Sequence, residues 1–124
     1  MKSLPKIADS EWQVMRVLWR QSPQTANEVV DELAPVTKWK PKTIKTLLNR
    51  LVSKRALGFT REGRAYQYQP LVSEAECVKA NSRSFLERVY GGALVPMLAH
   101  FIEDSRLSQE EIAELKRILD EKGR

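Results

Sequence analysis

The segment 38–68 constrains the fold of this 124-residue chain more than any other part of its sequence. Its fourth residue is Pro41, which suits the first position of a helix. Apolar side chains then recur at helical spacing, at Ile44, Leu47, Leu48, Leu51 and Val52. This spacing predicts an amphipathic helix over residues 41–55, with Gly58 as its stop. Residues 59–61, the turn Glu62-Gly63 and residues 64–69 predict a short β-hairpin.

Two further helices are predicted before this segment. Asp9 or Ser10 can cap a helix that carries an apolar stripe and ends at Ser22-Pro23. The series Thr25-Ala-Asn-Glu28 has the form of a capping box and predicts a second helix, which we expect to stop at Pro35. The predicted fold class is mainly α: an N-terminal winged helix-turn-helix (three helices plus a small β-hairpin wing) followed by a helical dimerisation region.

Basic side chains dominate the segment 38–68. It holds nine Lys and Arg residues and a single acid, Glu62, although the whole chain has a net charge of only +5. A basic helix and hairpin in a helix-turn-helix context indicate a surface for DNA. Lys and Arg suit phosphates, and Thr, Asn and Arg can reach base edges in the major groove. On the helix we expect DNA contacts from Lys42, Thr43, Lys45, Thr46, Asn49 and Arg50, and on the wing from Arg61 and Arg64.

Other interpretations of these residues remain open at this stage. Arg61 and Arg64 also fit an ordinary soluble turn, and Trp39 fits a packing role as well as a phosphate contact. Tyr66 and Tyr68 lie on one strand face, where we expect them in the core. The whole segment also fits a winged-helix module that binds an acidic protein, or a non-specific DNA-binding protein whose affinity depends steeply on salt.

The C-terminal part of the chain is predicted to be helical and to pair with a second copy. Helical patterns cover residues 73–90 and 93–102, separated by Gly91-Gly92, and the capping box Ser108-Gln-Glu-Glu111 opens a last helix. In a monomer these helices would leave a contiguous set of apolar side chains exposed to solvent. A second copy could cover them, and two-fold dimers are the commonest oligomers. The expected interface residues are Leu94, Met97, Leu98, Phe101, Ile112, Leu115 and Leu119. We therefore expect a winged-helix DNA-binding domain over residues 1–71 and a helical dimerisation domain over residues 72–124.

Several classes of protein are disfavoured by the sequence. It has one cysteine, Cys77, no apolar run near the roughly 18 residues of a membrane span and no signal-peptide pattern, so we expect a cytoplasmic protein without membrane contact. It has no Gly-rich phosphate loop, no His-Glu-x-x-His motif and no paired cysteines. The only histidine, His100, lacks the partners of a triad or metal site. We expect no enzyme activity, no cofactor and no metal ion.

Five motifs occur together in an order that is found in a known family. They are Ser10-Glu11-Trp12-x-Val-Met, Thr25-Ala-Asn-Glu28, Trp39-x-Pro41-Lys-Thr-Ile-Lys-Thr-Leu-x-Asn-Arg-Leu, Tyr66-x-Tyr68 and Ser108-Gln-Glu-Glu-Ile. With them the chain resembles the penicillinase repressors of the BlaI/MecI type, within the BlaI/MecI/CopY superfamily of winged-helix transcriptional regulators. The resemblance runs from residue 7 to residue 122.

The resemblance implies a homodimeric transcriptional repressor that binds an inverted-repeat operator in double-stranded DNA, often built on TACA/TGTA elements. It places Lys42, Thr43, Lys45, Thr46 and Arg50 in or beside the major groove. In antibiotic-responsive members a membrane sensor-protease signal leads to cleavage of an Asn-Phe bond in the dimerisation helices. The matching bond here is His100-Phe101. The copper-responsive sister group ends in a Cys-x-Cys metal cluster, which this chain lacks.

Overall fold

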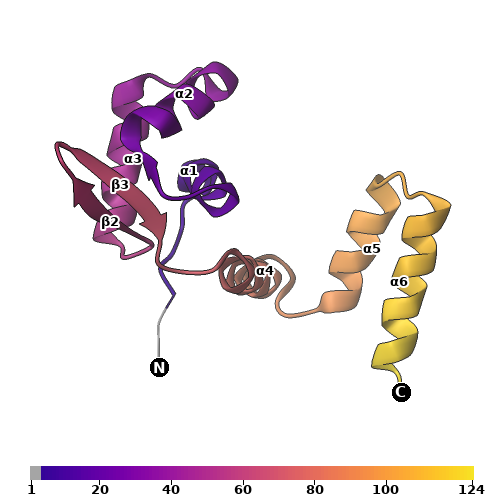
Figure 1. The fold of residues 1–124 in the computed structure, drawn as a ribbon. Coiled ribbons are helices and arrows are strands. Elements are labelled where there is room, and N and C mark those ends of the chain that lie inside the picture. The colour runs from indigo at the N-terminus through magenta and orange to yellow at the C-terminus, as the bar shows by residue number, and fades with distance from the viewer. Residues whose placement is uncertain (1–3) are drawn as a thin grey trace. The chain divides into compact units, whose positions relative to one another are not determined.

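The computed structural model describes residues 4–124. These residues form six helices and three strands, drawn in Figure 1, and they divide into two compact units between Asn81 and Ser82. The first unit holds α1 (Asp9–Arg20), β1 (Gln24–Thr25), α2 (Ala26–Thr37), α3 (Pro41–Ser53), β2 (Leu57–Glu62), β3 (Ala65–Pro70) and the first part of α4 (Glu74–Tyr90). The second holds the rest of α4, α5 (Leu94–Asp104) and α6 (Gln109–Lys122). The predicted fold class is confirmed.

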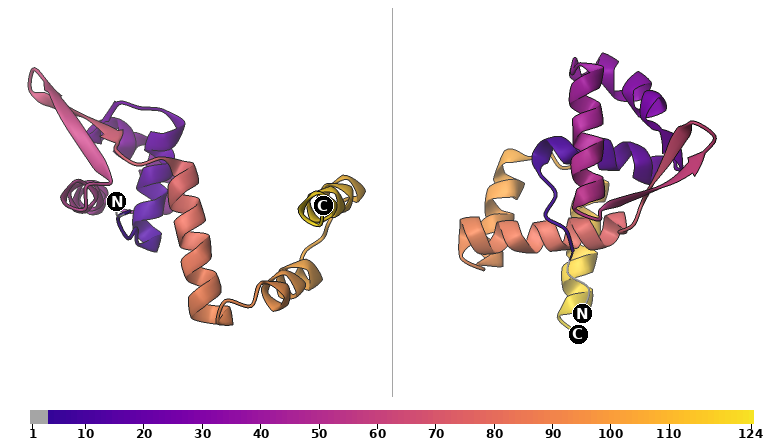
Figure 2. Two further views of the ribbon diagram at one scale, coloured as in Figure 1. Left: turned by 90° about the horizontal axis from the view of Figure 1, so that it is seen from below. Right: turned by 90° about the vertical axis from the view of Figure 1, so that its left-hand side faces the viewer.

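The core of the first unit lies where α1, α2 and α3 contact one another and the sheet. Its fully buried side chains include Met15 and Leu18 from α1, and Ile44, Leu48 and Leu51 from α3. Each large apolar side chain that is buried in this way contributes about 1.5–3 kcal/mol to stability. Both views in Figure 2 show the hairpin extending from the three-helix group beside α3.

The first helix begins differently from the prediction. It starts at Asp9, so that Ala8, and not Asp9 or Ser10, occupies the capping position without a side-chain cap. The buried carboxylate of Glu11 accepts a hydrogen bond from the Ala8 N–H at 2.8 Å. Glu11 therefore supplies a hydrogen-bond acceptor at the start of α1, where the capping residue provides none from its own side chain.

The second helix continues beyond Pro35, where we expected it to stop, and ends at Thr37. A proline near the end of a helix removes one hydrogen bond from a turn whose last carbonyls can be satisfied by other groups. The Thr37 hydroxyl donates to the Leu33 carbonyl at 2.8 Å, and the Lys38 N–H donates to the Ala34 carbonyl at 2.9 Å. Lys38 then takes a left-handed conformation and turns the chain towards α3. The predicted capping box at Thr25 and Glu28 is present.

The third helix has Pro41 at its first turn, as predicted, but ends at Ser53 and not at Arg55. Arg55 adopts a positive φ of 66° and reverses the chain. Gly58 is therefore not the helix stop, and it lies inside β2. A Cβ on Gly58 would meet the side chain of Leu71 at 3.0 Å, so a close approach between neighbouring segments explains this glycine.

The sheet has the strand order β1-β3-β2 and is antiparallel throughout. The hairpin turn lies at Gly63 and Arg64, one residue later than predicted, because β2 continues to Glu62 and β3 begins at Ala65. Gly63 has a positive φ of 63° there. The two-residue strand β1, which pairs with β3, was not predicted, and a strand so short carries no periodic signal of its own.

The second unit consists of helices with no fully buried side chain within residues 82–124. Pro96 lies in the first turn of α5, where a proline is tolerated, and the Ser108–Glu111 capping box opens α6 as predicted. Phe85 of α4 stacks on Phe101 of α5 with ring centroids 6.1 Å apart. Val78 and Val89 of α4 are exposed, and Cys77 is the residue of α4 that is buried, in the core of the first unit.

Candidate nucleic-acid interface

Helix α3 has two chemically different faces. Its apolar residues are locked in the core, and a side chain on the opposite face cannot turn inward without breaking that packing. All six residues that we predicted as DNA contacts on this helix are exposed: Lys42, Thr43, Lys45, Thr46, Asn49 and Arg50. None of them is an acid, so α3 presents a positive and hydrogen-bonding surface to solvent.

Thr46 lies in the middle of this surface. Its hydroxyl donates a hydrogen bond to the Lys42 carbonyl at 2.9 Å. With its proton used in the helix, the Thr46 oxygen remains free to accept a hydrogen bond. In the major groove, that property matches the amino groups of adenine and cytosine.

Both wing arginines are exposed and lie beside the hairpin turn. Arg61 is the more constrained of the two, since its Nε donates to the Gly63 carbonyl at 3.1 Å and its guanidinium lies 6.0 Å from the centre of the Tyr66 ring. Tyr68 is buried in the core as predicted, and burial raises the pKa of its hydroxyl. Tyr66 is 44% exposed, contrary to prediction, because it lies two residues nearer the turn, where the hairpin extends past the core.

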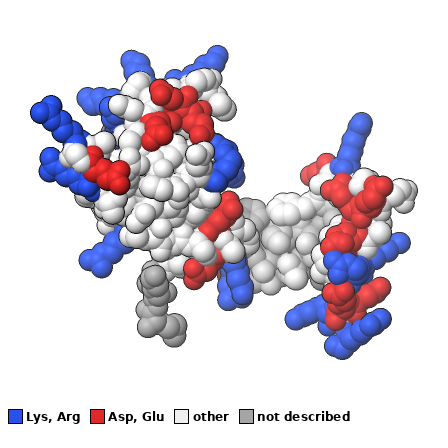
Figure 3. Space-filling model, in the orientation of Figure 1, with Lys and Arg blue, Asp and Glu red and all other residues white. Residues whose placement is uncertain are grey.

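Basic side chains of the first unit surround this surface. Figure 3 shows Lys and Arg side chains projecting from the part of the unit that holds the hairpin and α3. One basic residue of the segment 38–68 has a different role: Lys54 donates to the buried carboxylate of Glu11 at 2.5 Å and to the Lys6 carbonyl at 2.9 Å. Trp39 is partly buried and packs against the core, which favours its packing role over a phosphate contact.

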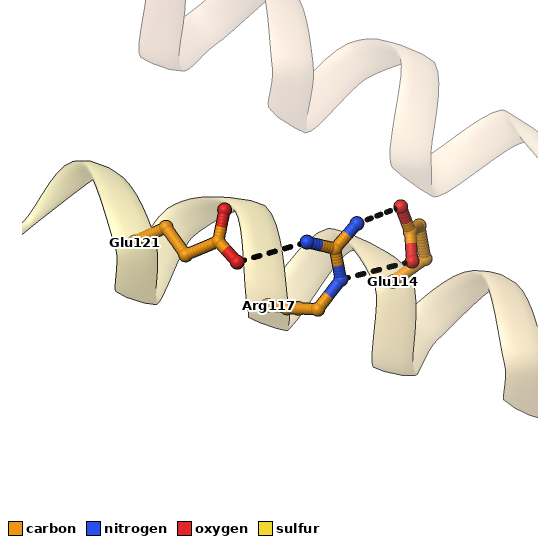
Figure 4. Close-up of polar contacts among 3 residues, drawn as sticks. All are labelled: Glu114, Arg117 and Glu121. Atoms are coloured by element: carbon orange, nitrogen blue, oxygen red, sulfur yellow. Dashed lines mark hydrogen bonds and ion pairs between the residues drawn. The ribbon is translucent and has the colours of Figure 1, made fainter.

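The seven residues predicted for the dimer interface all lie on α5 and α6 of the second unit. Leu94, Phe101, Leu115 and Leu119 are exposed, and Met97, Leu98 and Ile112 are half-buried. On α6, Arg117 makes ion pairs with Glu114 and Glu121, which Figure 4 shows along one side of the helix. These two carboxylates raise the pKa of the Arg117 guanidinium. At 100° per residue, the ion pairs lie on the side of α6 opposite Ile112, Leu115 and Leu119.

The predicted cleavage bond His100-Phe101 lies inside α5. The Nδ1 of His100 is hydrogen-bonded to the Tyr90 hydroxyl at 2.9 Å, and the Phe101 carbonyl accepts from the Ser105 hydroxyl at 2.5 Å. A protease that binds extended chain would therefore need α5 to open locally first.

Within residues 4–124, no three His, Cys, Asp or Glu side chains gather as metal ligands would. None of the helices in that range is long and apolar enough to cross a membrane.

Comparison with known proteins identifies relatives over nearly the whole chain. The penicillinase repressor of Bacillus licheniformis is 46% identical over 121 residues, which cover 98% of this chain and 94% of that protein. The methicillin resistance regulatory protein MecI of Staphylococcus aureus is 35% identical over 117 residues, which cover 94% of this chain and 95% of that protein. The resemblance inferred from the five motifs is thus confirmed.

Solved structures agree with the fold of the first unit. The solution structure of monomeric Bacillus licheniformis BlaI in complex with the blaP half-operator is 45% identical and superimposes with a TM-score of 0.54, covering 61% of this chain and 93% of that one. The Staphylococcus aureus regulator MepR, 20% identical with a TM-score of 0.54 and covering 94% of this chain and 77% of that one, shares the fold alone. The penicillinase repressor family itself matches residues 7–121. This chain belongs to the penicillinase repressor family.

Proposed function

We propose that this protein is a transcriptional repressor that binds a dyad-symmetric operator as a homodimer. In each subunit α3 enters the major groove, and the wing contacts the neighbouring sugar-phosphate backbone. The observation that carries the proposal is the division of α3 into a buried apolar face and an exposed face of Lys, Thr, Asn and Arg. A relative that is 45% identical over this unit has been solved on its half-operator, which supports the same use of α3 here.

Different residues of this surface have different tasks in the proposed complex. Lys42, Lys45, Arg61 and Arg64 neutralise phosphates, so they set affinity and its dependence on salt. Thr46, Asn49 and Arg50 offer the hydrogen-bonding groups that can tell one base pair from another. Thr43 lies on the first turn of α3, at the edge of the groove. The task of residues 1–71 is therefore DNA binding.

Residues 72–124 supply the dimer in this proposal. Several large apolar side chains of α5 and α6 face solvent in one chain, among them Leu94, Phe101 and Leu119, which are 49%, 50% and 62% exposed. Contiguous apolar surface of this kind marks an interaction site, and a second copy covers it in the proposed dimer. Linking two DNA-binding units in this way raises operator affinity, because binding of the second half-site becomes intramolecular.

Loss of the dimer gives the proposed repressor a route to induction. Cleavage at His100-Phe101 by a sensor-protease, the route that the family resemblance implies, would cut α5 between residues of the proposed interface. The separated DNA-binding units would then lose the gain from linked half-sites and leave the operator.

Selection of bound sequences from a random DNA pool, with the purified protein near physiological salt, tests the proposal. An enriched inverted repeat with half-sites spaced by whole helical turns is the expected result. Binding at low salt without any enriched sequence would indicate a non-specific DNA-binding protein. The absence of DNA binding under all conditions would favour a module that binds an acidic protein.

A further inference from the structure

We propose that Tyr66 and Phe59 are positioning residues that hold Arg61 in place for its contact with a DNA phosphate. The inference rests on the proposed function and gives a role to two exposed aromatic residues of the wing. Phe59 and Tyr66 are 47% and 44% exposed, although both are large aromatic side chains. Neither carries a charge that could bind a phosphate itself.

Four side chains form a continuous ladder on one face of the hairpin. The strand register pairs Phe59 with Tyr68 and Arg61 with Tyr66, so all four point to the same side of the two strands. The Phe59 ring lies 6.1 Å from the Tyr68 ring and meets the Tyr66 ring edge-on at 4.7 Å, centroid to centroid. Tyr68 is 8% exposed and belongs to the core of the first unit. The ladder therefore connects the core to the part of the hairpin nearest the turn.

Arg61 lies at the outer end of this ladder. Its guanidinium carbon is 6.0 Å from the centre of the Tyr66 ring, within the range of a cation–π contact. Its Nε–H donates to the Gly63 carbonyl at 3.1 Å, which fixes the guanidinium from a second direction. Within residues 4–124 the four N–H groups on its two terminal nitrogens make no hydrogen bond, so they remain free for phosphate oxygens.

Arg64, on the other side of the turn, is a natural comparison. No hydrogen bond, ion pair or aromatic contact of its side chain occurs within the described residues 4–124. A guanidinium that is already held loses less side-chain freedom on binding than one that is not, and such pre-organisation raises affinity. The Tyr66 ring should therefore matter to DNA affinity through Arg61 and not through Arg64.

A double-mutant cycle tests this dependence. Affinity for the selected operator is measured by fluorescence anisotropy for Tyr66→Leu, Arg61→Ala and the double variant. Tyr66→Leu should weaken binding about two- to five-fold, the effect of losing an exposed cation–π contact. Arg61→Ala should weaken it further, and adding Tyr66→Leu to Arg61→Ala should cause no additional loss.

Three further variants separate positioning from other roles of the ring. Tyr66→Phe keeps the ring and should bind as the wild type does. In an Arg64→Ala background, Tyr66→Leu should still cause its full two- to five-fold loss, because Arg61 is present. Phe59→Leu, which removes the next ring of the ladder, should show the same dependence on Arg61 and provides a second route to the result should Tyr66→Leu not fold.

Two results would overturn the inference while leaving the repressor proposal intact. One is an equal loss from Tyr66→Leu with and without Arg61, which would mean that the ring contacts DNA or supports the wing independently. The other is an Arg61→Ala variant that binds as tightly as the wild type. A wild-type protein that fails to bind any DNA would instead overturn the proposed function and this inference with it.

Discussion

The Nζ of Lys54 lies 2.5 Å from Oε1 of Glu11, a carboxylate whose side chain is only 1% exposed. The pair joins the first turn of α1 to the residue that caps the C-terminal end of α3. Glu11 also accepts from the Ala8 N–H, and Lys54 also donates to the Lys6 carbonyl. Lys54 therefore helps to hold α3 in place, although it lies in the basic segment 38–68 that we propose for DNA binding.

Replacing Lys54 with methionine should destabilise the first unit. The substitution leaves the buried Glu11 carboxylate without its cation, and removing one partner of a fully buried pair costs about 3–5 kcal/mol. Because the Lys54 side chain is 36% exposed, we expect a smaller loss of about 1–3 kcal/mol in the free energy of unfolding, measured by urea denaturation. Lys45→Met, which removes an exposed lysine of α3, should change stability by less than about 0.5 kcal/mol.

Replacing Glu11, the partner of Lys54, tests whether the loss of stability in Lys54→Met comes from this ion pair. Glu11→Gln in the Lys54→Met background should cost less than it does in the wild type, since a neutral amide needs no cation. Additive losses from the two substitutions would show that Glu11 and Lys54 act independently, and would contradict the role given to the pair.

Arg50 and Thr46 should decide which operator is bound. Arg50→Ala and Thr46→Ala should each lower operator affinity by about 1–3 kcal/mol if the side chains read base edges. The effect on random DNA of equal length should be much smaller, because random DNA offers no matched base. Titrations of both DNAs at one salt concentration measure the difference. An unchanged ratio of operator to random affinity would exclude base readout by these side chains.

Arg64 should act on all sequences alike. A phosphate contact carries no sequence information, so Arg64→Ala should weaken binding to operator and random DNA by the same factor. It should also reduce the slope of log affinity against log salt by about one unit, since one fewer counterion is released. Arg64→Lys, which keeps the charge, should leave that slope unchanged. A loss confined to the operator would contradict the phosphate role.

The sequence predicts those parts of the fold that depend on neighbouring residues. The capping boxes at Thr25 and Ser108 and the proline at position 41 predict three helix starts, and the repeat from Ile44 to Val52 predicts the buried face of α3. Each of these signals lies within one or two helical turns, so it can be recognised without the rest of the chain.

The features that the sequence did not predict depend on residues that are far apart in the chain, or on local hydrogen bonds that outweigh a helix-stop signal. The strand β1 exists only because Gln24 and Thr25 pair with Tyr68 and Gln67. The ion pair between Lys54 and Glu11 likewise joins the end of α3 to the first turn of α1, which are far apart in the sequence. At the end of α2, a threonine hydroxyl and the N–H of a left-handed lysine satisfy the last carbonyls, and this local compensation outweighs the stop signal of Pro35.

Cys77 should make stability fall at alkaline pH. Burial, with a smaller contribution from the charge of Glu76, raises the pKa of its thiol in the folded protein. The unfolded chain therefore loses this proton first, near its ordinary pKa of about 8.5. The stabilising contribution is present below that pH and is lost as pH rises through the folded pKa. Urea denaturation at several pH values should show a steeper alkaline decline for the wild type than for Cys77→Ala, and identical declines would contradict the shift.

Leu115 should control the oligomeric state. It lies on the apolar side of α6, which we propose as part of the dimer interface, opposite the ion pairs of Arg117. Leu115→Asp would place a charge without a partner in that interface, where burial of a charge is costly. Sedimentation should therefore show a dimer for the wild type and a monomer for the variant. Operator affinity should fall with it, because each half-site must then be bound separately.

Ala113→Asp is the matched control for this substitution. It adds the same charge two residues away, at an exposed position on the other side of the same helix, so the dimer and its operator affinity should both remain. If Ala113→Asp also dissociated the dimer, the added charge would be acting through helix stability, and the comparison would not support an interface at Leu115. If Leu115→Asp remained a dimer, the proposed interface on α6 would be wrong, and the exposed residues of α5, such as Leu94 and Phe101, would have to form it without α6.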